Sequence, residues 1–418
     1  MRILWFTNIP LLEEVRLDVY SKGSWLFALS AALAQREGIE LGIVSIVPGG
    51  NYIKCQKQNI KHYIVPSRAR KGFNDFTKEI ILHYSDVIDD FKADLVHIHG
   101  TEKSYGLLSA YGYIRCPVVI TIQGLIHVYL RHYYGGVSFS DTVKMGTLGD
   151  WLPYYRLAST RMRWQYHLRR EIEIIKKNRF FICKTLWDKA HLLAVNPDAK
   201  YFHCDELLRP EFYRQSWDIS RIRRHSIFVP TASYPLKGFH WVLRAAGILK
   251  RQFPDLLIRV ADSPLTRHGK YNSWLNNGYA GYLKKLIRKF GLEKNTVNLG
   301  ILTAQEMAGE LLNANVFIAA SLVENWCTAL QEAMLVGTPS VVSCAGGMPS
   351  LARDGKDALF FPAGDEAVLA EQVRNIFNDD ALARDLSEAA RKAGAVRNAK
   401  EAVVNRTLEI YEDICNRG

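Results

Sequence analysis

Short apolar runs alternate with longer segments of helical periodicity along most of the chain. In the first half, the runs RILWFTN, ELGIVSIV, DLVHIHG and PVVITIQG predict buried strands, and GSWLFALSAALAQ, with apolar positions three and four apart, predicts a helix. In the second half, the runs HSIFVPTA, DLLIRVAD, TVNLG, NVFIAAS and PSVVSC alternate with helical segments such as GFHWVLRAAGILKRQF and NWCTALQEAMLVG. This alternation predicts an α/β protein in which two doubly wound, parallel sheets are covered by helices on both faces.

The polar and charged stretch over residues 205–226 separates the two halves. We therefore expect an N-terminal domain over 1–210 and a C-terminal domain over 211–395. The chain of 418 residues is long enough to give each domain a sizeable core. The terminal segment, 396–418, has an amphipathic pattern and is predicted to form a helix.

Residues 125–180 interrupt the alternation and hold much of the net charge of +12. Aromatic residues are interleaved with basic ones there, a composition that suits the interface of an anionic membrane. The alternative is a solvated helical insertion whose aromatic rings pack on their own domain. Nucleic-acid binding is the least favoured reading, because no signature of a nucleic-acid-binding fold accompanies the charge. The basic residues are Arg131, Lys144, Arg156, Arg161, Arg163, Arg169, Arg170, Lys176, Lys177 and Arg179.

Composition favours a cytoplasmic protein. No apolar run reaches the roughly 18–20 residues that a membrane-spanning helix needs. The first residues, MRILWFTNIPLLEE, are predicted to form a strand, because they lack the apolar stretch and the cleavage site of a signal peptide. The seven cysteines are scattered and none forms a CxxC pair, which indicates reduced thiols and neither a disulfide framework nor a zinc site.

The stretch SLVENWCTALQEAMLVGTPSVVS, residues 321–343, combines a strand end, a turn and a helix start. Ligands of open parallel sheets bind beyond the carboxyl ends of the strands. Asn325 is a good N-cap, so we expect the helix to begin near Trp326. The backbone N–H groups near Cys327 and Thr328 would then be placed to bind phosphate.

Two glutamates of this stretch are candidate ligands for sugar hydroxyls. Thr328 and Glu332 are four residues apart and share a helix face. Because a carboxylate offers two acceptor oxygens in one plane, Glu332 suits the diol of a ribose, and Glu324 in the turn suits a sugar. The alternative makes Glu332 a solvated helix residue and Glu324 a favourable charge near a helix N-terminus.

Other strand ends carry further candidates. Lys237 and Gly238 open a helix after the run HSIFVPTA, where a lysine stabilises the charge of a diphosphate leaving group. The alternative is an ordinary surface lysine. Gly346 and Gly347 follow the run PSVVSC and suit either a loop close to a ligand or a plain tight turn.

In the first half of the chain, four residues occupy comparable places. Gly23 precedes a helix and is a candidate contact for an anion or a sugar. His99 and Glu102 come at the end of the run DLVHIHG, and Gln123 ends the run PVVITIQG. A histidine in such a place is alternatively a core residue with satisfied hydrogen bonds.

Taken in order, these features resemble the donor half of retaining glycosyltransferases of the GT-B fold. The resemblance is to the group-one, family-four type that builds bacterial polysaccharides. The segment ENWCTALQEAMLVGTPSVVSCAGGMP is similar to that family's glutamate-pair signature and the loop after it. The likeness is strongest over residues 227–375 and looser in the N-terminal part. It implies two facing Rossmann-like domains with a cleft between them, and a last helix that packs back on the first domain.

The resemblance also implies roles for individual residues. Lys237 would bind the donor diphosphate, Glu324 would hold the donor sugar and Glu332 would hold the ribose. The remaining implied contacts are the amides near Cys327 and Thr328 for phosphate, the backbone at Asn298, Leu299, Gly300 and Ile301 for the base, and Gly23 on the phosphate side.

The chain departs from the family pattern at two positions. Thr231 stands near the place where the family often has an arginine, about six residues before the lysine. Gln123 replaces a common histidine at a strand end. Glutamine binds a sugar hydroxyl but does not titrate, which fits a reaction in which the leaving phosphate takes the acceptor's proton.

The resemblance thus implies a retaining hexosyltransferase that moves a sugar from a nucleotide sugar, UDP-linked by expectation, to a hydroxyl of a lipid-linked or growing glycan. Capsule, exopolysaccharide and O-antigen synthesis are the processes it suggests. No cofactor or metal is expected, because the sequence holds no Asp-x-Asp triplet. Two alternatives stay open: a sugar-nucleotide epimerase of the same fold, and a non-catalytic nucleotide-sugar-binding partner of a transferase. The basic, aromatic insertion suggests peripheral attachment to the inner face of the cell membrane.

Overall fold

The chain divides into two compact units, each described below by itself. The computed structural model describes residues 1–12, 24–67, 76–138, 157–263, 265 and 278–417. The first unit consists of Met1–Val128, Arg163–Leu208 and Asn398–Gly418, and the second of Tyr129–Met162 and Arg209–Arg397.

This division differs from the sequence-based domains in one respect. Residues 129–162, which we had placed inside the first domain, group with the second unit. The alternation of strands and helices could not reveal this, because the segment holds no strand among its described residues. The units otherwise change over at Leu208 and Arg397, within a few residues of the expected positions.

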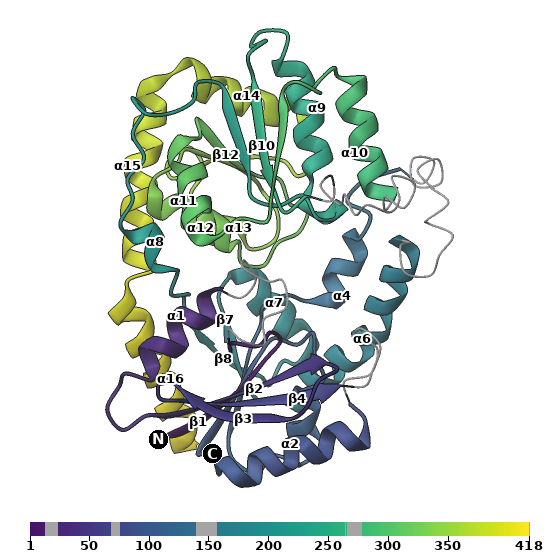
Figure 1. The fold of residues 1–418 in the computed structure, drawn as a ribbon, viewed down its shortest axis with the longest axis vertical. Helices are drawn as coiled ribbons and strands as arrows, with labels where there is room; N and C mark the ends of the chain where they lie inside the picture. The colour runs from purple at the N-terminus through teal and green to yellow at the C-terminus, as the bar shows by residue number, and fades with distance from the viewer. Residues whose placement is uncertain (13–23, 68–75, 139–156, 264, 266–277, 418) are drawn as a thin grey trace. The chain divides into compact units, whose positions relative to one another are not determined.

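The first unit is built on an eight-stranded sheet with the order β3-β4-β2-β1-β5-β6-β7-β8 (Figure 1). Every neighbouring pair is parallel except β3 and β4, which form an antiparallel hairpin that the apolar pattern did not predict. The strands are β1 (Arg2–Thr7), β2 (Glu40–Pro48), β3 (Ile53–Lys57), β4 (Ile60–Ser67), β5 (Leu95–His99), β6 (Val118–Thr121), β7 (Phe180–Cys183) and β8 (Lys200–His203).

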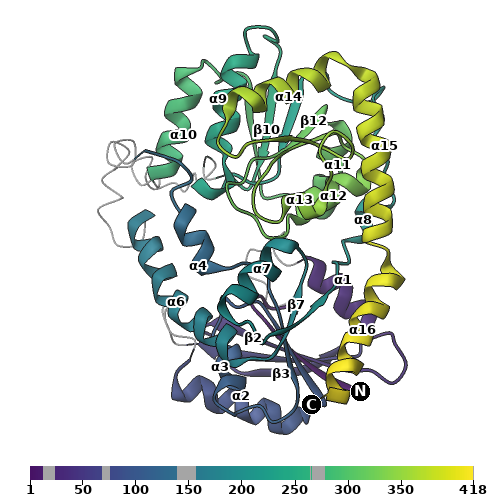
Figure 2. The ribbon, with the colours of Figure 1, turned by 180° about the vertical axis from the view of Figure 1, so that it is seen from behind.

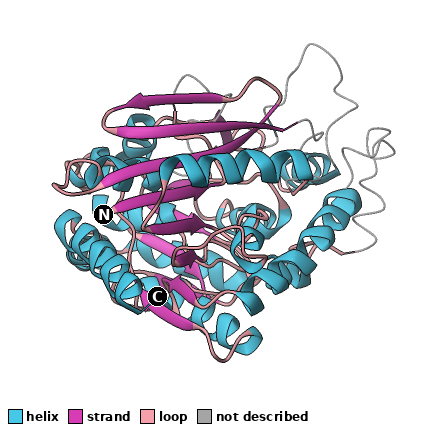
Figure 3. Cartoon of the chain, turned by 90° about the horizontal axis from the view of Figure 1, so that it is seen from below, coloured by secondary structure: helices cyan, strands magenta, loops and turns pink. Residues whose placement is uncertain are grey.

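Side chains of the first sheet alternate between two apolar clusters, one on each face. Leu4 and Phe6 of β1 belong to one cluster, and Ile3 and Trp5 belong to the other. Helices therefore lie on both sides of the strands (Figure 3). These helices are α1 (Ser24–Leu33), α2 (Lys78–Phe91), α3 (Gly106–Ala110), α4 (Ile126–Tyr129), α6 (Leu157–Lys177), α7 (Leu186–Val195) and α16 (Lys400–Arg417).

The last helix, α16, is anchored in the first unit by Tyr411. The Tyr411 hydroxyl accepts a hydrogen bond from Trp5 Nε1 at 3.1 Å and lies 2.6 Å from His97 Nδ1. All three side chains are buried, so these bonds satisfy polar groups that water does not reach. Figures 1 and 2 show α16 beside α1, which it contacts.

The second unit has a six-stranded, wholly parallel sheet with the order β11-β10-β9-β12-β13-β14. Its core strands are fully buried, as expected for a parallel sheet covered on both faces. The strands are β9 (Ser226–Val229), β10 (Leu257–Ala261), β11 (Thr296–Gly300), β12 (Val316–Ala319), β13 (Ser340–Ser343) and β14 (Leu359–Phe361).

Helices of the second unit follow its strands in the predicted alternation (Figure 2). They are α8 (Pro210–Tyr213), α9 (Phe239–Leu249), α10 (Gly278–Lys289), α11 (Ala304–Asn313), α12 (Thr328–Val336), α13 (Met348–Leu351), α14 (Glu366–Asn378) and α15 (Asp380–Arg397). Both units are thus α/β with parallel sheets, which confirms the predicted class. None of the helices among the described residues is long and apolar enough to cross a membrane.

Candidate functional site

Lys237 and Glu324 form an ion pair at the carboxyl ends of two neighbouring strands of the second unit. Lys237 ends the short 3₁₀ helix η5 (Pro235–Lys237) after β9, and Glu324 lies in the turn after β12. Lys237 Nζ is 2.7 Å from Glu324 Oε2, which also accepts a hydrogen bond from Ser321 Oγ at 3.0 Å. The side chains are only 21% and 11% exposed, so the reading of Lys237 as an ordinary surface lysine is wrong.

The ion pair keeps Lys237 charged. Desolvation lowers the pKa of Lys237, but the adjacent Glu324 carboxylate outweighs it, and the net shift is well above the ordinary value. A lysine in this state stays cationic at neutral pH and offers a fixed positive charge to an anionic ligand.

Glycines at two turns allow the backbone to approach this pair closely. Gly238 has φ +70°, and a Cβ there would lie 1.9 Å from the carbonyl oxygen of Ala320. Gly346 has φ +58°, and a Cβ there would lie 2.0 Å from the carbonyl oxygen of Glu324, which accepts a hydrogen bond from the amide of Gly347 at 2.7 Å. Gly346 and Gly347 therefore pack on the backbone of the turn that holds Glu324. The sequence did not predict this contact.

Helix α12 begins at Thr328, with Cys327 as its N-cap, and not near Trp326 as the sequence suggested. Asn325 does not cap it, because the chain stays in a non-helical turn up to Cys327. The first intrahelical bonds are donated by Leu330 and Gln331 to the Cys327 carbonyl. The amides ahead of them have no partner within the helix itself, as in the first turn of any helix. Burial raises the pKa of the Cys327 thiol to about 12, so this cysteine is not a nucleophile at neutral pH.

Glu332 is buried in α12 and paired with Arg209, where the chain returns to the second unit. Arg209 Nη2 and Nε lie 2.7 Å and 3.0 Å from Glu332 Oε1. The glutamate side chain is 4% exposed, so the alternative of a solvated helix residue is wrong. Arg209 was not a candidate from the sequence, because it lies in the charged stretch that we assigned to the domain boundary.

The other residues considered for the donor site lie near the carboxyl ends of β9, β10 and β11. Thr231 Oγ1 donates a hydrogen bond to Asp262 Oδ2 at 3.1 Å, so an acidic group lies beside this position. Asn298 Oδ1 accepts from the amide of Gly300, which has φ +73°. The Nδ2 of Asn298 is buried and has no partner among the described residues. Asn298, Leu299 and Gly300 are all half-buried.

In the first unit, His99 and Glu102 lie at the end of β5. His99 is fully buried against Trp5 and Trp25, with ring centroids 4.4 Å and 5.5 Å away, and neither ring nitrogen has a hydrogen-bond partner among the described residues. His99 is therefore a core residue, as the alternative has it, but its ring nitrogens are not satisfied by the described residues. Glu102 Oε2 accepts a hydrogen bond from Asn8 Nδ2 at 3.0 Å, and desolvation raises the pKa of Glu102 to about 7.

Comparison with known proteins identifies the second unit. Residues 211–393 match the family described as glycosyl transferases group 1. Over these residues, which are less than half of the chain, the protein is similar to the group 1 glycosyltransferases. The match covers the Lys237 loop, the glutamate turn and α12, which are the elements on which the sequence-based resemblance rested.

The chain is also similar in sequence to curated relatives and in fold to solved structures. The chain is 25% identical over 226 residues to an MMP alpha-(1->4)-mannosyltransferase of Mycolicibacterium hassiacum, a match over 54% of this chain and 48% of that protein. The chain thus spans about half the length of this curated relative. Sucrose-phosphate synthase from Thermosynechococcus elongatus is similar in structure, with a TM-score of 0.75, 14% identity and full coverage of both chains. Anabaena Alr3699/HepE in complex with UDP-glucose matches with a TM-score of 0.69, 15% identity and full coverage of both chains. The fold is GT-B, as predicted.

In the second unit, one neighbour of the ion pair comes from a distant part of the sequence. The amide of Asn325 donates a hydrogen bond of 3.1 Å to the hydroxyl of Tyr129, which is 196 positions earlier. Desolvation raises the pKa of Tyr129 well above its usual value, and the Glu324 carboxylate raises it further. Tyr129 lies in the basic, aromatic insertion and was not a candidate, because nothing in its local pattern connects it to the glutamate turn.

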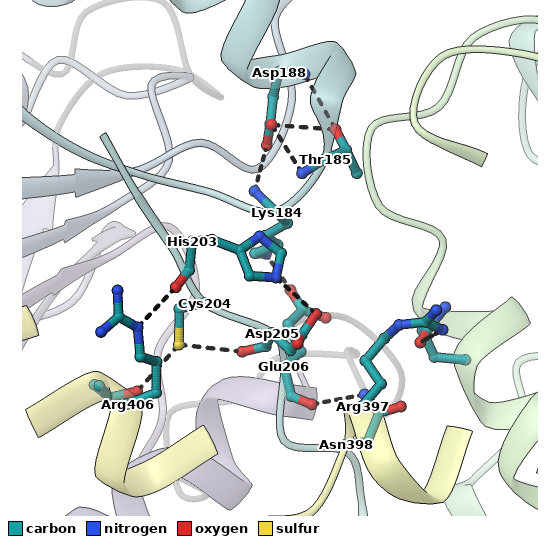
Figure 4. A network of polar contacts seen from close by, with 12 residues as sticks. Lys184, Thr185, Asp188, His203, Cys204, Asp205, Glu206, Arg397, Asn398 and Arg406 are labelled. Carbon is teal, nitrogen blue, oxygen red and sulfur yellow. Dashed lines mark hydrogen bonds and ion pairs between the residues drawn. The ribbon is translucent and has the colours of Figure 1, made fainter. Parts of the chain in front are cut away.

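The first unit also holds polar clusters that sequence reasoning missed. The buried Lys184 after β7 forms an ion pair with the buried Glu206, whose backbone carbonyl accepts a hydrogen bond from Asn398 Nδ2 at 2.8 Å (Figure 4). The fully buried Glu171 of α6 lies 2.7 Å from His127 Nδ1 and accepts a hydrogen bond from the amide of Ile126 at 2.8 Å. In both clusters, the side chains that interact come from positions distant in the sequence.

The structure adds little about two of the predicted site residues, Gln123 and Gly23. Gln123 follows β6 and is half-buried. Gly23 lies outside the described residues, as do residues 139–156 of the insertion. The described part of the insertion divides: α6 buries Glu171, Ile174 and Ile175 in the first unit, whereas Arg169, Lys176 and Lys177 are exposed.

Proposed function

We propose that this protein is a retaining glycosyltransferase that moves a sugar from a nucleotide sugar, UDP-linked, to a hydroxyl of a lipid-linked or growing glycan in polysaccharide synthesis. The observation that carries the proposal is the Lys237–Glu324 ion pair ahead of the α12 amides in a group 1 glycosyltransferase domain. A cation and a carboxylate side by side suit the two ends of a nucleotide sugar, the diphosphate and the hydroxyls. The UDP-glucose complex of the Anabaena neighbour supports the choice of a uridine nucleotide.

The reaction exchanges one bond for another at the anomeric carbon. The bond from that carbon to the phosphate oxygen breaks, a bond to the acceptor oxygen forms on the same face, and the acceptor's proton passes to the leaving phosphate. In this proposal Lys237 and the amides at the start of α12 stabilise the charge that develops on the diphosphate. Glu324 orients the sugar and Glu332 binds the ribose. No metal ion is needed for this charge balance, since a lysine and a helix N-terminus supply the positive field.

A thermal-shift screen with UDP, GDP, ADP and their common sugars tests the donor site. A ligand that binds only the folded state raises the melting temperature. We expect one nucleotide and its sugars to do so, and we expect Lys237→Ala and Glu332→Ala each to lose most of the shift. The absence of any response to the whole panel would overturn the assignment.

A non-catalytic nucleotide-sugar-binding protein is the second candidate. It is favoured by Thr231, whose hydroxyl faces Asp262 where the family pattern suggests an arginine. This candidate predicts nucleotide-sugar binding without sugar transfer and without slow donor hydrolysis. Release of UDP from UDP-sugar, measured with and without an acceptor, separates the two.

We also propose that the exposed basic side chains of the insertion attach the enzyme to anionic membrane from the cytoplasmic side. Arg169, Lys176 and Lys177 support this, because they extend from α6 into solvent. Arg170 gives less support, since its guanidinium donates hydrogen bonds to Ser104 and Tyr166 at 2.8 Å each.

A further inference from the structure

A strap from the first half of the sequence is built into the donor-binding unit. Residues 129–138, here called the strap, belong to the second unit and cross the start of α9. The carbonyl oxygen of Gly135 accepts two hydrogen bonds from that helix, from His240 Nε2 at 2.9 Å and from Trp241 Nε1 at 3.2 Å. These bonds fix the strap directly beside the loop that presents Lys237.

Two consecutive glycines make this close packing possible. Gly135 has φ +62°, and a Cβ there would lie 2.4 Å from the carbonyl oxygen of Pro235, which begins η5. Gly136 has φ +77°, and a Cβ there would lie 2.9 Å from the Trp241 ring. His240 is buried, and burial lowers its pKa to about 4, so it stays neutral near pH 7 with Nε2 as the donor to Gly135.

The strap carries the hydroxyl of Tyr129 to the glutamate turn. That hydroxyl accepts the hydrogen bond from the amide of Asn325, the residue next to Glu324. Lys237, Glu324 and Tyr234 all act electrostatically on the phenol, so its oxygen lies within the charged cluster that the proposed function assigns to the sugar end of the donor. A phenol both donates and accepts hydrogen bonds, as a sugar hydroxyl does.

We propose that Tyr129 occupies the donor-sugar subsite in the ligand-free enzyme and limits which sugars enter it. This inference rests on the proposed function. The Tyr129 hydroxyl accepts the hydrogen bond from the Asn325 amide that a hydroxyl of the donor sugar would otherwise accept. A nucleotide sugar therefore displaces the phenol when it binds. A nucleoside diphosphate without the sugar has its contacts at Lys237, Glu332 and the start of α12, and leaves Tyr129 in place.

The test compares a nucleotide with its sugar conjugate on one variant. Affinities of UDP and UDP-glucose, or of GDP and GDP-mannose if the guanine nucleotide is the one that binds, are measured by calorimetry on the wild type and on Tyr129→Phe. A net hydrogen bond contributes about 1 kcal/mol, which corresponds to roughly a fivefold change in affinity. We therefore expect Tyr129→Phe to bind the sugar conjugate about fivefold more tightly and the nucleotide unchanged.

Two controls make the result specific. Tyr134→Phe makes the same chemical change at an exposed ring of the same strap and should leave both affinities unchanged. Gly135→Ala should lift the strap from Pro235 and reproduce the effect of Tyr129→Phe. Gly112→Ala is its matched control, because Gly112 has a similar φ of +77° and open space around its Cβ position.

Two outcomes for Tyr129→Phe would overturn the inference, and a third result would overturn the proposed function. Weaker binding of the sugar conjugate by Tyr129→Phe would mean that the phenol contacts the bound sugar directly. An equal change for both ligands would mean that Tyr129 only supports the fold of the turn. Loss of nucleotide binding by the wild type itself would overturn the proposed function instead, so the two failures are distinguishable.

Discussion

Arg209, the first residue of the segment 209–397 of the second unit, donates two hydrogen bonds to a single oxygen of Glu332. The arginine side chain is 11% exposed and its Nη1 is buried without a partner among the described residues. The ion pair therefore holds the Glu332 side chain of α12 against the start of the segment 209–397.

Removing Arg209 should destabilise the protein more than removing the pair. Arg209→Ala removes the cation that faces the buried Glu332 carboxylate, which costs about 3–5 kcal/mol. The double variant Arg209→Ala/Glu332→Ala removes both charges and should recover a large part of that loss. Urea denaturation of the wild type, both single variants and the double variant measures this coupling. Strictly additive losses would contradict a direct pairing.

Gly346→Ala should impair donor binding, whereas Gly355→Ala should not. Both glycines have positive φ, +58° and +67°, so the backbone strain of an alanine is similar at the two positions. Only at Gly346 would the new Cβ meet the backbone of Glu324, and the turn must then shift. We expect the nucleotide-dependent rise in melting temperature to fall for Gly346→Ala and to persist for Gly355→Ala. Equal effects would show that strain alone matters.

Lys237→Ala should reduce turnover by a factor of about 10²–10³, the usual cost of losing one group that stabilises developing charge. The group acts on the leaving diphosphate, so kcat should fall as well as kcat/KM. Lys285→Ala, which removes an exposed lysine from α10, is the matched control. A rise in KM with unchanged kcat would mean that Lys237 only binds the donor.

Stability of the first unit should fall as pH rises through the titration of Glu102. Its pKa is raised from 4.5 to about 7, so the folded state holds the proton more tightly than the unfolded state. Below about pH 4.5 both states are protonated and the group imposes no penalty. Between pH 4.5 and 7 the unfolded state loses its proton first, and the free energy of unfolding decreases by roughly 3 kcal/mol. Thermal denaturation of Glu102→Gln should lack this decrease; a pH profile identical to that of the wild type would contradict it.

Neutralising the four arginines of α6 and its N-terminal end should weaken binding to liposomes that contain phosphatidylglycerol. These are Arg161, Arg163, Arg169 and Arg170. Each basic residue near an anionic surface contributes about 1 kcal/mol, so the loss should be large and salt-dependent. A variant that neutralises the same number of exposed basic residues on α15 and α16 controls for net charge. Unchanged sedimentation with liposomes would end the membrane proposal.

Much of the fold followed from local pattern. Buried strands of a parallel sheet are continuously apolar, so β1, β2, β5, β6 and β9 to β13 were predicted from the sequence, although β7, β8 and β14 were missed. The hairpin of β3 and β4 was not, because β3 is an exposed edge strand with polar residues such as Lys54 and Gln56. The start of α12 was misplaced by about two residues, because Asn325 has the chemistry of an N-cap but the turn continues past it.

The sequence by itself determined the residue types at the strand ends: Lys237 after β9, Glu324 after β12 and Glu332 four residues after Thr328. Parallel strands bring their carboxyl ends to one edge of the sheet, so chain order was enough to predict that these groups serve one site. Only the tertiary structure decided that Arg209 pairs with Glu332, that Gly346 packs on Glu324 and that Tyr129 reaches Asn325. Those contacts join residues up to 196 positions apart. Local periodicity does not determine which distant side chain forms a hydrogen bond with a given residue.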